Sequence, residues 1–136
     1  MQDASEFRTI HQIIKKAKQN LNQNLWDYVI GGSNTETTLK RNRAAIDSRA
    51  LQPKVLNDVS NVDTSATVVG QKLTMPVVLA PIGSLQNIVE GGGATAAIAA
   101  EEAGIMSISS SVCDPILEDI AAASHAPKTV SYTHLT

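Results

Sequence analysis

The run PVVLAP, Pro76 to Pro81, is continuously apolar between its two prolines. Short apolar runs without alternation are typical of strands buried on both faces of a parallel sheet. The alanine-rich stretch 93–103 follows, and it predicts a helix that ends at Gly104. A second short apolar strand is expected at 105–109. Strand, helix and strand in this order predict a βαβ unit with a right-handed crossover.

The residues on either side extend this α/β pattern. Asp114 or Pro115 is expected to open a further helix, from Ile116 to about Ala123, and a third strand is expected to begin at Pro127. Upstream, residues 66–74 predict a small hairpin that turns at Gly70. The second half of the chain is therefore expected to be an α/β fold with a parallel sheet.

The first 65 residues have a helical pattern instead. The helix that contains Tyr28 is expected to stop at Gly31-Gly32. Asn34 or Thr35 is expected to cap the next helix. A first helix is predicted from apolar residues at helical spacing: Ile10, Ile13, Ile14, Ala17 and Leu21.

Composition limits the class of protein. The chain has 136 residues, of which 43% are hydrophobic and 3% aromatic, so its core is expected to consist of aliphatic side chains. A formal net charge of -2 argues against a nucleic-acid surface. The single cysteine, Cys113, excludes an internal disulfide framework. The sequence lacks the apolar segment of a signal peptide and any run near the roughly 20 residues of a membrane span, so a cytoplasmic protein is expected.

Ligands of parallel α/β folds bind at the carboxyl ends of the strands. Two places satisfy this rule: Ala80-Pro81-Ile82-Gly83 after the first strand, and Ser109-Ser110-Ser111 after the second. The first offers a fixed turn and a glycine against which a flat ligand can lie, and the second offers hydroxyl groups. Spacing alone favours plainer interpretations, namely a Pro-Gly loop and a serine-rich helix N-cap.

Other reactive residue types are expected to be structural. Gly91-Gly92-Gly93 matches neither the dinucleotide fingerprint nor the P-loop spacing, so it is interpreted as the turn into a helix. Cys113 is expected to be a small buried residue, and no spacing predicts a metal site. His11 and His125 are expected on the surface.

A series of short motifs runs in order from about Leu25 to about Ala123. The motifs are Asp27-Tyr28, Gly32, Glu36-x-Thr38-Leu39, Asn42, Leu51-x-Pro53-x-x-Leu56, Asp58-Val59-Ser60-x-Val62-Asp63, Gly70, Pro76, Ala80-Pro81, Glu90-Gly91, Ala103-Gly104 and Ser109-Ser110. Each motif is unspecific by itself, but the ordered set resembles the FMN-dependent 2-hydroxy-acid oxidase and dehydrogenase family. Members of that family oxidise acids such as glycolate, lactate and mandelate.

The resemblance implies a TIM barrel preceded by helices, with FMN as the cofactor and a small 2-hydroxy acid as the substrate. It implies that Tyr28 hydrogen-bonds the substrate carboxylate. Pro81, Ile82 and Gly83 would lie along the flavin ring, mostly through main-chain atoms, and Ser109 would hydrogen-bond the ring. Family members often have Thr and Ala at the positions of Ile82 and Gly83. A hydroxyl contact is thus lost at 82, and the flavin face is less crowded at 83.

The resemblance places the catalytic histidine and the two substrate-binding arginines of the family on later strands, so no catalytic residue is expected in this chain. The chain is expected to supply about two βα units and the start of a third, and so to be an inactive fragment by itself. The electron acceptor is expected to be oxygen or a redox carrier, and the full-length protein a homo-oligomer. Two alternatives stay open: another FMN barrel, similar to the type 2 isopentenyl diphosphate isomerase, and a non-catalytic α/β domain that binds a partner.

These features divide the chain into a helical segment (1–65), a hairpin with the first βα units (66–129) and a tail (130–136). The tail, VSYTHLT, alternates in a way that suits a strand. However, it lacks the aromatic-Gln-Leu-Tyr pattern that the resemblance implies for the third strand. It also resembles the translation of a transposon-end adapter used in sequencing libraries. We therefore expect the resemblance to natural sequence to end near Thr129 and the last seven residues not to belong to the natural protein.

Overall fold

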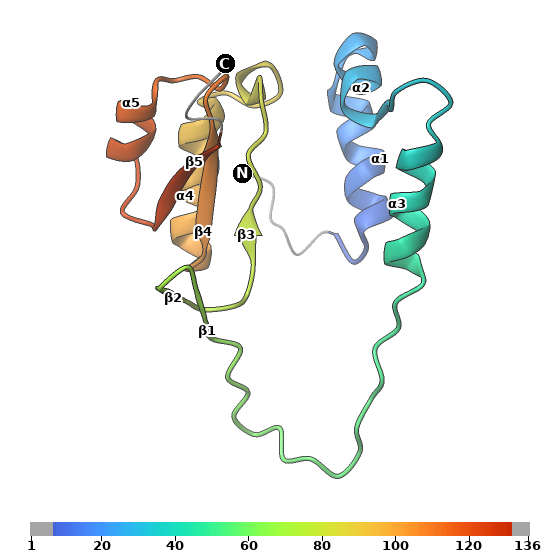
Figure 1. Ribbon diagram of the computed structural model, residues 1–136, viewed down its shortest axis with the longest axis vertical. Helices are drawn as coiled ribbons and strands as arrows, with labels where there is room; N and C mark the ends of the chain where they lie inside the picture. Colours follow the sequence, from blue (N-terminus) through green and yellow to red (C-terminus); the bar gives the residue numbers. More distant parts are fainter. Residues whose placement is uncertain (1–6, 132–136) are drawn as a thin grey trace. The chain divides into compact units, whose positions relative to one another are not determined.

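The computed structural model describes residues 7–131, and the chain forms two compact units, residues 1–57 and 58–136. The first unit is helical, and the second combines short strands with helices (Figure 1). Within residues 7–131, no helix is long and apolar enough to cross a membrane.

The helical unit begins with two helices whose ends follow local sequence signals. Helix α1, Ile10–Asn20, starts at a capping box in which the Thr9 hydroxyl accepts from the Gln12 amide and the Gln12 side chain accepts from the Thr9 amide. Helix α2, Gln23–Ile30, starts where the Asn22 side chain accepts from the Leu25 amide at 3.0 Å. It ends at Gly31, as predicted. Lys18 of α1 lies 5.5 Å from the centre of the Trp26 ring, which is a cation–π contact between the two helices.

Helix α3, Thr37–Asp47, does not have the predicted cap. Its N-cap residue is Glu36, not Asn34 or Thr35, and no side chain caps the helix. Glu36 has a left-handed backbone (φ 57°), and its carboxylate accepts from the Gly32 amide at 3.3 Å. The tight turn after α2 therefore determines where α3 begins, because it brings the Glu36 carboxylate back to Gly32.

The α/β unit starts with the predicted hairpin. Strand β1, Ala66–Val68, pairs antiparallel with β2, Gln71–Leu73, and Ala66 lies opposite Leu73. Val69 and Gly70 both have positive φ, 49° and 75°, as a two-residue turn of this kind requires. Leu73 is only 2% exposed, so the hairpin contributes a side chain to the core.

A parallel sheet follows, with the strand order β3-β4-β5. Strand β4, Met106–Ser110, lies between β3, Val78–Leu79, and β5, Lys128–Ser131. Leu79 is paired with Ser107, and Ser109 is paired with Val130. Because the strands are parallel and in sequential order, their carboxyl ends lie at one edge.

Strand β3 is shorter than the predicted strand 76–81, and it is not buried on both faces. Val78 and Leu79 are half-buried, and Val77 is 45% exposed. Proline has no amide proton to donate, which limits pairing at both ends of the PVVLAP run. Within the described residues, β3 also has a strand neighbour on one side only.

Helix α4, Gly92–Ala103, covers the sheet and ends at Gly104 (φ 66°), as predicted. The 3-10 helix η2, Leu85–Asn87, precedes it. Helix α5, Leu117–Ala122, follows β4 and lies within the predicted range 116–123, but its N-cap residue is Ile116 and not Asp114 or Pro115. The backbone of Asp114 is bonded elsewhere, to Gln86 and to Gly93. The core consists mainly of small and aliphatic side chains: Leu73, Ala97, Ala100, Ile105, Met106, Cys113 and Ile120.

The predicted tail falls partly within the described residues. Val130 and Ser131 continue β5, in register with Ser109 and Ser110. Residues 132–136 lie outside the described residues.

Candidate functional site

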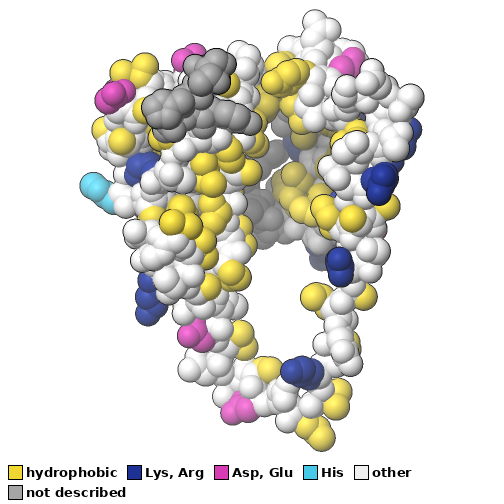
Figure 2. Space-filling model, in the orientation of Figure 1, with side chains coloured by type: hydrophobic (Ala, Val, Ile, Leu, Met, Phe, Trp, Pro, Cys, Tyr) yellow, Lys and Arg dark blue, Asp and Glu magenta, His cyan; other side chains and the backbone are white. Residues whose placement is uncertain are grey.

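The edge formed by the carboxyl ends of β3 and β4 carries the residues that the sequence singled out in the second half of the chain. The loop after β3 contains Pro81, Ile82 and Gly83, and the loop after β4 begins beyond Ser110. Figure 2 shows hydrophobic side chains exposed over the α/β unit. The aliphatic side chains exposed in these two loops are Ile82 (53%), Val112 (58%) and Ile116 (63%).

Gly83 lies directly against the loop that follows β4. A Cβ atom at this position would lie 3.0 Å from Cγ2 of Val112 and 3.8 Å from Oγ of Ser110. The next residue binds the same loop, since the Ser84 amide donates to the Val112 carbonyl at 3.1 Å. The two loops therefore form one surface, in which glycine at 83 leaves room for the side chain of Val112.

The main chain of the first loop offers hydrogen-bond donors. Among residues 7–131, the amides of Ile82 and Gly83 donate to no other group, whereas the Ser84 amide does. Two neighbouring free amides at a strand end can donate to the carbonyl or ring nitrogen of a flat heterocycle. The exposed Ile82 side chain beside them offers an apolar contact. This donor set fits a flavin ring.

Ser109 is placed differently from Ser110. Successive strand residues point to opposite faces, so Ser109 shares a face of β4 with Ser107 and Ser110 does not. Both serines line, together with Ile82, a cavity of about 20 Å³ between the strands and α4, which has room for about one water molecule. Ser110 is 4% exposed, and its hydroxyl accepts from the Val112 amide at 3.3 Å.

The structure thus brings four of the five predicted site residues into the α/β unit, and it adds two to which the resemblance assigned no role. Ser110 and Val112 are the residues that contact the position of Gly83. The run of three serines was a sequence signal for Ser110. Val112 had no signal, because its contact with Gly83 joins two separate loops.

Gly91-Gly92-Gly93 forms the predicted turn into a helix. The Gly93 amide donates to the Asp114 carbonyl at 2.9 Å, and a Cβ at Gly93 would lie 2.6 Å from Cδ1 of Ile120. The amide that a phosphate would need is therefore already bonded, and the glycine serves close packing. Cys113 is 8% exposed, which confirms the prediction of a small buried residue.

Tyr28 lies in the helical unit, on α2, and its side chain is 67% exposed. Its phenol makes no hydrogen bond within the described residues, so it can donate to a ligand. The end of α2 is tightly built, because the Gly31 amide donates to the Asp27 carbonyl at 2.9 Å and a Cβ at Gly31 would lie 2.7 Å from that oxygen.

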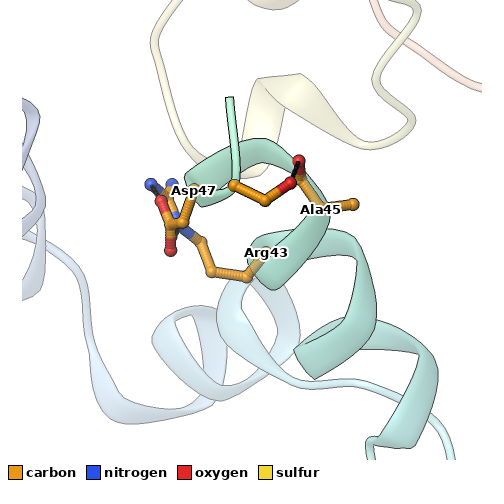
Figure 3. Close-up of polar contacts among 4 residues, drawn as sticks. Arg43, Ala45 and Asp47 are labelled. Atoms are coloured by element: carbon orange, nitrogen blue, oxygen red, sulfur yellow. Dashed lines mark hydrogen bonds and ion pairs between the residues drawn. The ribbon is translucent and has the colours of Figure 1, made fainter. Parts of the chain in front are cut away.

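Within residues 7–131, the shifted pKa values belong to three surface carboxylates and to the guanidinium of Arg43. The Arg43 side chain donates to Asp47, with 2.9 Å between Nε and Oδ2 (Figure 3). This hydrogen bond lowers the pKa of Asp47 and raises the pKa of Arg43. At the C-cap of α3, the Ser48 hydroxyl donates to the Ala45 carbonyl at 2.8 Å. Both charged side chains are more than half exposed, so the pair supports α3 and is not a catalytic group.

Asp58 and Asp63 also have lowered pKa values. In each case the main cause is a backbone amide two residues later, that of Ser60 and that of Ser65. A lowered pKa makes a carboxylate a weaker base, so neither is a candidate for proton abstraction. Within residues 7–131, no group of three or more His, Cys, Asp or Glu residues could hold a metal ion.

Comparison with known proteins identifies related sequences. The family described as FMN-dependent dehydrogenase matches residues 17–135. Glycolate oxidase 1 of Oryza sativa subsp. indica is 42% identical over 96 residues, which cover 69% of this chain and 26% of that protein. An L-lactate dehydrogenase of Haemophilus influenzae (strain PittEE) is 35% identical over 124 residues, which cover 91% of this chain and 31% of that protein.

Solved structures show the same fold. A soluble mutant of the membrane-associated (S)-mandelate dehydrogenase from Pseudomonas putida superposes with a TM-score of 0.82 at 29% identity, over 88% of this chain and 34% of that chain. A mandelate oxidase in complex with 3,3-difluoro-2-hydroxy-3-phenylpropionic acid superposes with a TM-score of 0.85 at 26% identity, over 91% of this chain and 37% of that chain. The chain spans about a third or less of the length of the sequence relatives described above.

Proposed function

The chain belongs to the FMN-dependent dehydrogenase family, and on this premise we propose that the whole protein oxidises a small 2-hydroxy acid to the 2-keto acid. Glycolate, lactate and mandelate, which appear in the names of the relatives, are all 2-hydroxy acids. Because these relatives are oxidases and dehydrogenases, we favour oxidation of a 2-hydroxy acid over the isomerase reaction of the alternative FMN barrel.

The fold and the cofactor follow from family membership. The helical unit precedes the barrel, and the α/β unit corresponds to the first βα units of a TIM barrel. FMN is the cofactor. Ligands of this fold bind at the carboxyl ends of the strands, which is the edge that carries Gly83 and Ser110.

The observation that carries the proposal is the pair of amides of Ile82 and Gly83 at this edge, which donate to no group among residues 7–131. We assign these amides to the polar rim of the flavin, with Pro81 fixing the turn before them and Ser109 as a further donor. When bound, FMN supplies the acceptor for the two electrons that the substrate carbon loses. Gly83 keeps the ring close to the main chain, because it has no side chain on that face.

Tyr28 is assigned to the substrate and not to the flavin. Its exposed phenol can donate a hydrogen bond to the carboxylate that every 2-hydroxy acid carries. A hydrogen bond to a charged group contributes about 1.5–3 kcal/mol, enough to select acids over neutral alcohols.

The choice of electron acceptor is assigned to the flavin face near Ile82 and Gly83. An aliphatic side chain at 82 and no side chain at 83 change the space and polarity available to oxygen or to a redox carrier.

The cytoplasmic location and the homo-oligomeric state stay predictions, and one structural relative is described as membrane-associated. Fractionation of cells that produce the protein checks the first, and light scattering of the purified protein checks the second.

The test is to produce the full-length protein and to identify the cofactor released on denaturation. Glycolate, L-lactate and mandelate are then supplied in turn, with oxygen or a dye as the acceptor, and the keto acid is quantified. We expect one FMN per chain and turnover of at least one of these acids. A protein that purifies without FMN after supplementation, or that converts none of a wider panel of 2-hydroxy acids, contradicts the proposal.

A further inference from the structure

Three hydrogen bonds fasten the loop after β4 to the segment that follows β3. The Ser84 amide donates to the Val112 carbonyl at 3.1 Å, and the Gly93 amide donates to the Asp114 carbonyl at 2.9 Å. The third bond runs from the Asp114 amide to Oε1 of Gln86 at 3.1 Å. Two of these bonds join backbone groups and do not depend on residue type. Gln86 alone contributes a side chain.

Packing around Gln86 is close. Gln86 lies in η2, between the loop of Ile82 and Gly83 and the start of α4, and it is half-buried. A Cβ at Gly92 would lie 2.2 Å from the Asp114 carbonyl oxygen and 3.2 Å from Cβ of Gln86. Glycine at this position, with φ of 48°, therefore lets Gln86 and Asp114 approach the same point.

The bond reaches the flavin edge through the chain. Asp114 lies two residues after Val112, whose side chain contacts the position of Gly83. Gln86 lies three residues after Gly83. The Gln86–Asp114 bond therefore joins the segment after β3 to the loop after β4. The distance between these two parts of the chain determines how Gly83, Val112 and Ser110 face each other.

We propose that Gln86 is a positioning residue of the FMN site, which holds the loop after β4 at a fixed distance from Ile82 and Gly83. This inference rests on the proposed function. In this role Gln86 acts through Asp114 and Val112 and needs no contact of its own with the flavin or the substrate. This role requires a hydrogen-bond acceptor at the end of a side chain that is as long as that of glutamine. Glu keeps that acceptor at 86, and Ala removes it.

The test compares Gln86→Ala and Gln86→Glu in the full-length flavoprotein. Asn87→Ala is the matched control, because Asn87 is exposed on the same turn and its side chain makes no hydrogen bond within the described residues. After removal of FMN, the Kd for FMN is measured by flavin fluorescence, and the visible circular dichroism of the reloaded protein reports the surroundings of the ring. Hydrogen exchange at the Asp114 amide reports the bond itself without any cofactor.

We expect Gln86→Ala to raise the Kd for FMN by roughly 2- to 12-fold, the equivalent of one ordinary hydrogen bond. It should also alter the visible circular dichroism and speed exchange at Asp114. In Gln86→Glu, the Kd for FMN, the visible circular dichroism and the exchange rate at Asp114 should all stay within about twofold of the wild-type values. Asn87→Ala should change none of these three quantities.

Two results overturn the inference while leaving the proposed function intact. One is a wild-type protein that binds FMN and oxidises 2-hydroxy acids, with Gln86→Ala indistinguishable from it in FMN affinity and dichroism. The other is equal loss of FMN affinity and of melting temperature in both the Ala and Glu variants, which indicates a purely structural residue. A wild-type protein that never binds FMN overturns the proposed function itself.

Discussion

Gly83 and Val112 occupy adjoining space at the end of the sheet, since a Cβ on Gly83 would lie 3.0 Å from Cγ2 of Val112. The two residues belong to separate loops, one after β3 and one after β4. A side chain at 83 must therefore either displace Val112 or extend over the surface where we place the flavin.

Gly83→Val is expected to impair FMN binding or turnover in the full-length protein. A branched side chain cannot fit beside Val112 without a shift, and overpacking of this kind costs about 1–3 kcal/mol. The Kd for FMN and the rate of flavin reduction measure the effect. Gly83→Ala is the matched control. The loss caused by Gly83→Ala should be smaller than that caused by Gly83→Val. A second substitution in the same chain, Val112→Ala, should reduce the loss caused by Gly83→Val. Full activity and full flavin content in the valine variant would show that Gly83 does not touch the ring.

Tyr28→Phe is expected to affect the substrate and not the cofactor. Loss of one hydrogen bond to a carboxylate should lower kcat/KM by an amount equivalent to about 1.5–3 kcal/mol. FMN content and the flavin absorption spectrum should stay normal. Unchanged kinetics, or a variant that purifies without flavin, would count against this assignment.

Gly104→Ala is expected to lower the melting temperature more than Gly70→Ala does. Both glycines have left-handed backbones, with φ of 66° and 75°, so each substitution introduces a strain of about 1–2 kcal/mol. A Cβ at Gly70 meets nothing within 4 Å, whereas one at Gly104 would lie 2.4 Å from Cγ2 of Thr74.

Thr74 cannot turn away from Gly104 at low cost, because its hydroxyl donates to the Ala103 carbonyl at 2.7 Å. Overpacking should therefore add about 1–3 kcal/mol at Gly104 alone. Thermal melting of the two variants tests this. Equal shifts in melting temperature would mean that Thr74 moves away from the added Cβ at little cost.

A polypeptide of residues 1–136 by itself is expected to be poorly soluble and to bind no stoichiometric FMN. Many large apolar side chains are exposed within the described residues, including Leu51 (99%), Leu56 (101%) and Val77 (45%). Exposed apolar patches of this kind favour association. Size-exclusion chromatography with flavin absorbance checks this, and a monomeric, cooperatively melting product that carries FMN would contradict it.

The sequence predicted the features that depend on local chemistry. Gly104 ends α4 and Gly70 turns the hairpin because a left-handed backbone is accessible to glycine at little cost. The parallel order of the strands followed from the alternation of apolar runs with an alanine-rich helix. The family resemblance supplied the cofactor, which spacing alone had not favoured.

The parts that were missed depend on contacts between distant residues. Glu36 displaced Asn34 and Thr35 at the start of α3 because the Gly32 amide lies within its reach. The Gln86–Asp114 bond joins residues 28 positions apart, and no local motif announces it. The contact of Val112 with the position of Gly83 arises in the same way, from the pairing of β3 with β4.

The most direct test of the proposed FMN-dependent oxidation is an anaerobic titration of the full-length protein with glycolate, L-lactate and mandelate in turn. Without oxygen or another acceptor, the electrons removed from the substrate can only stay on the flavin. We expect about one equivalent of acid to bleach the absorption of the oxidised flavin and to yield one equivalent of keto acid. A flavin that stays oxidised while saturating acid is present would contradict it.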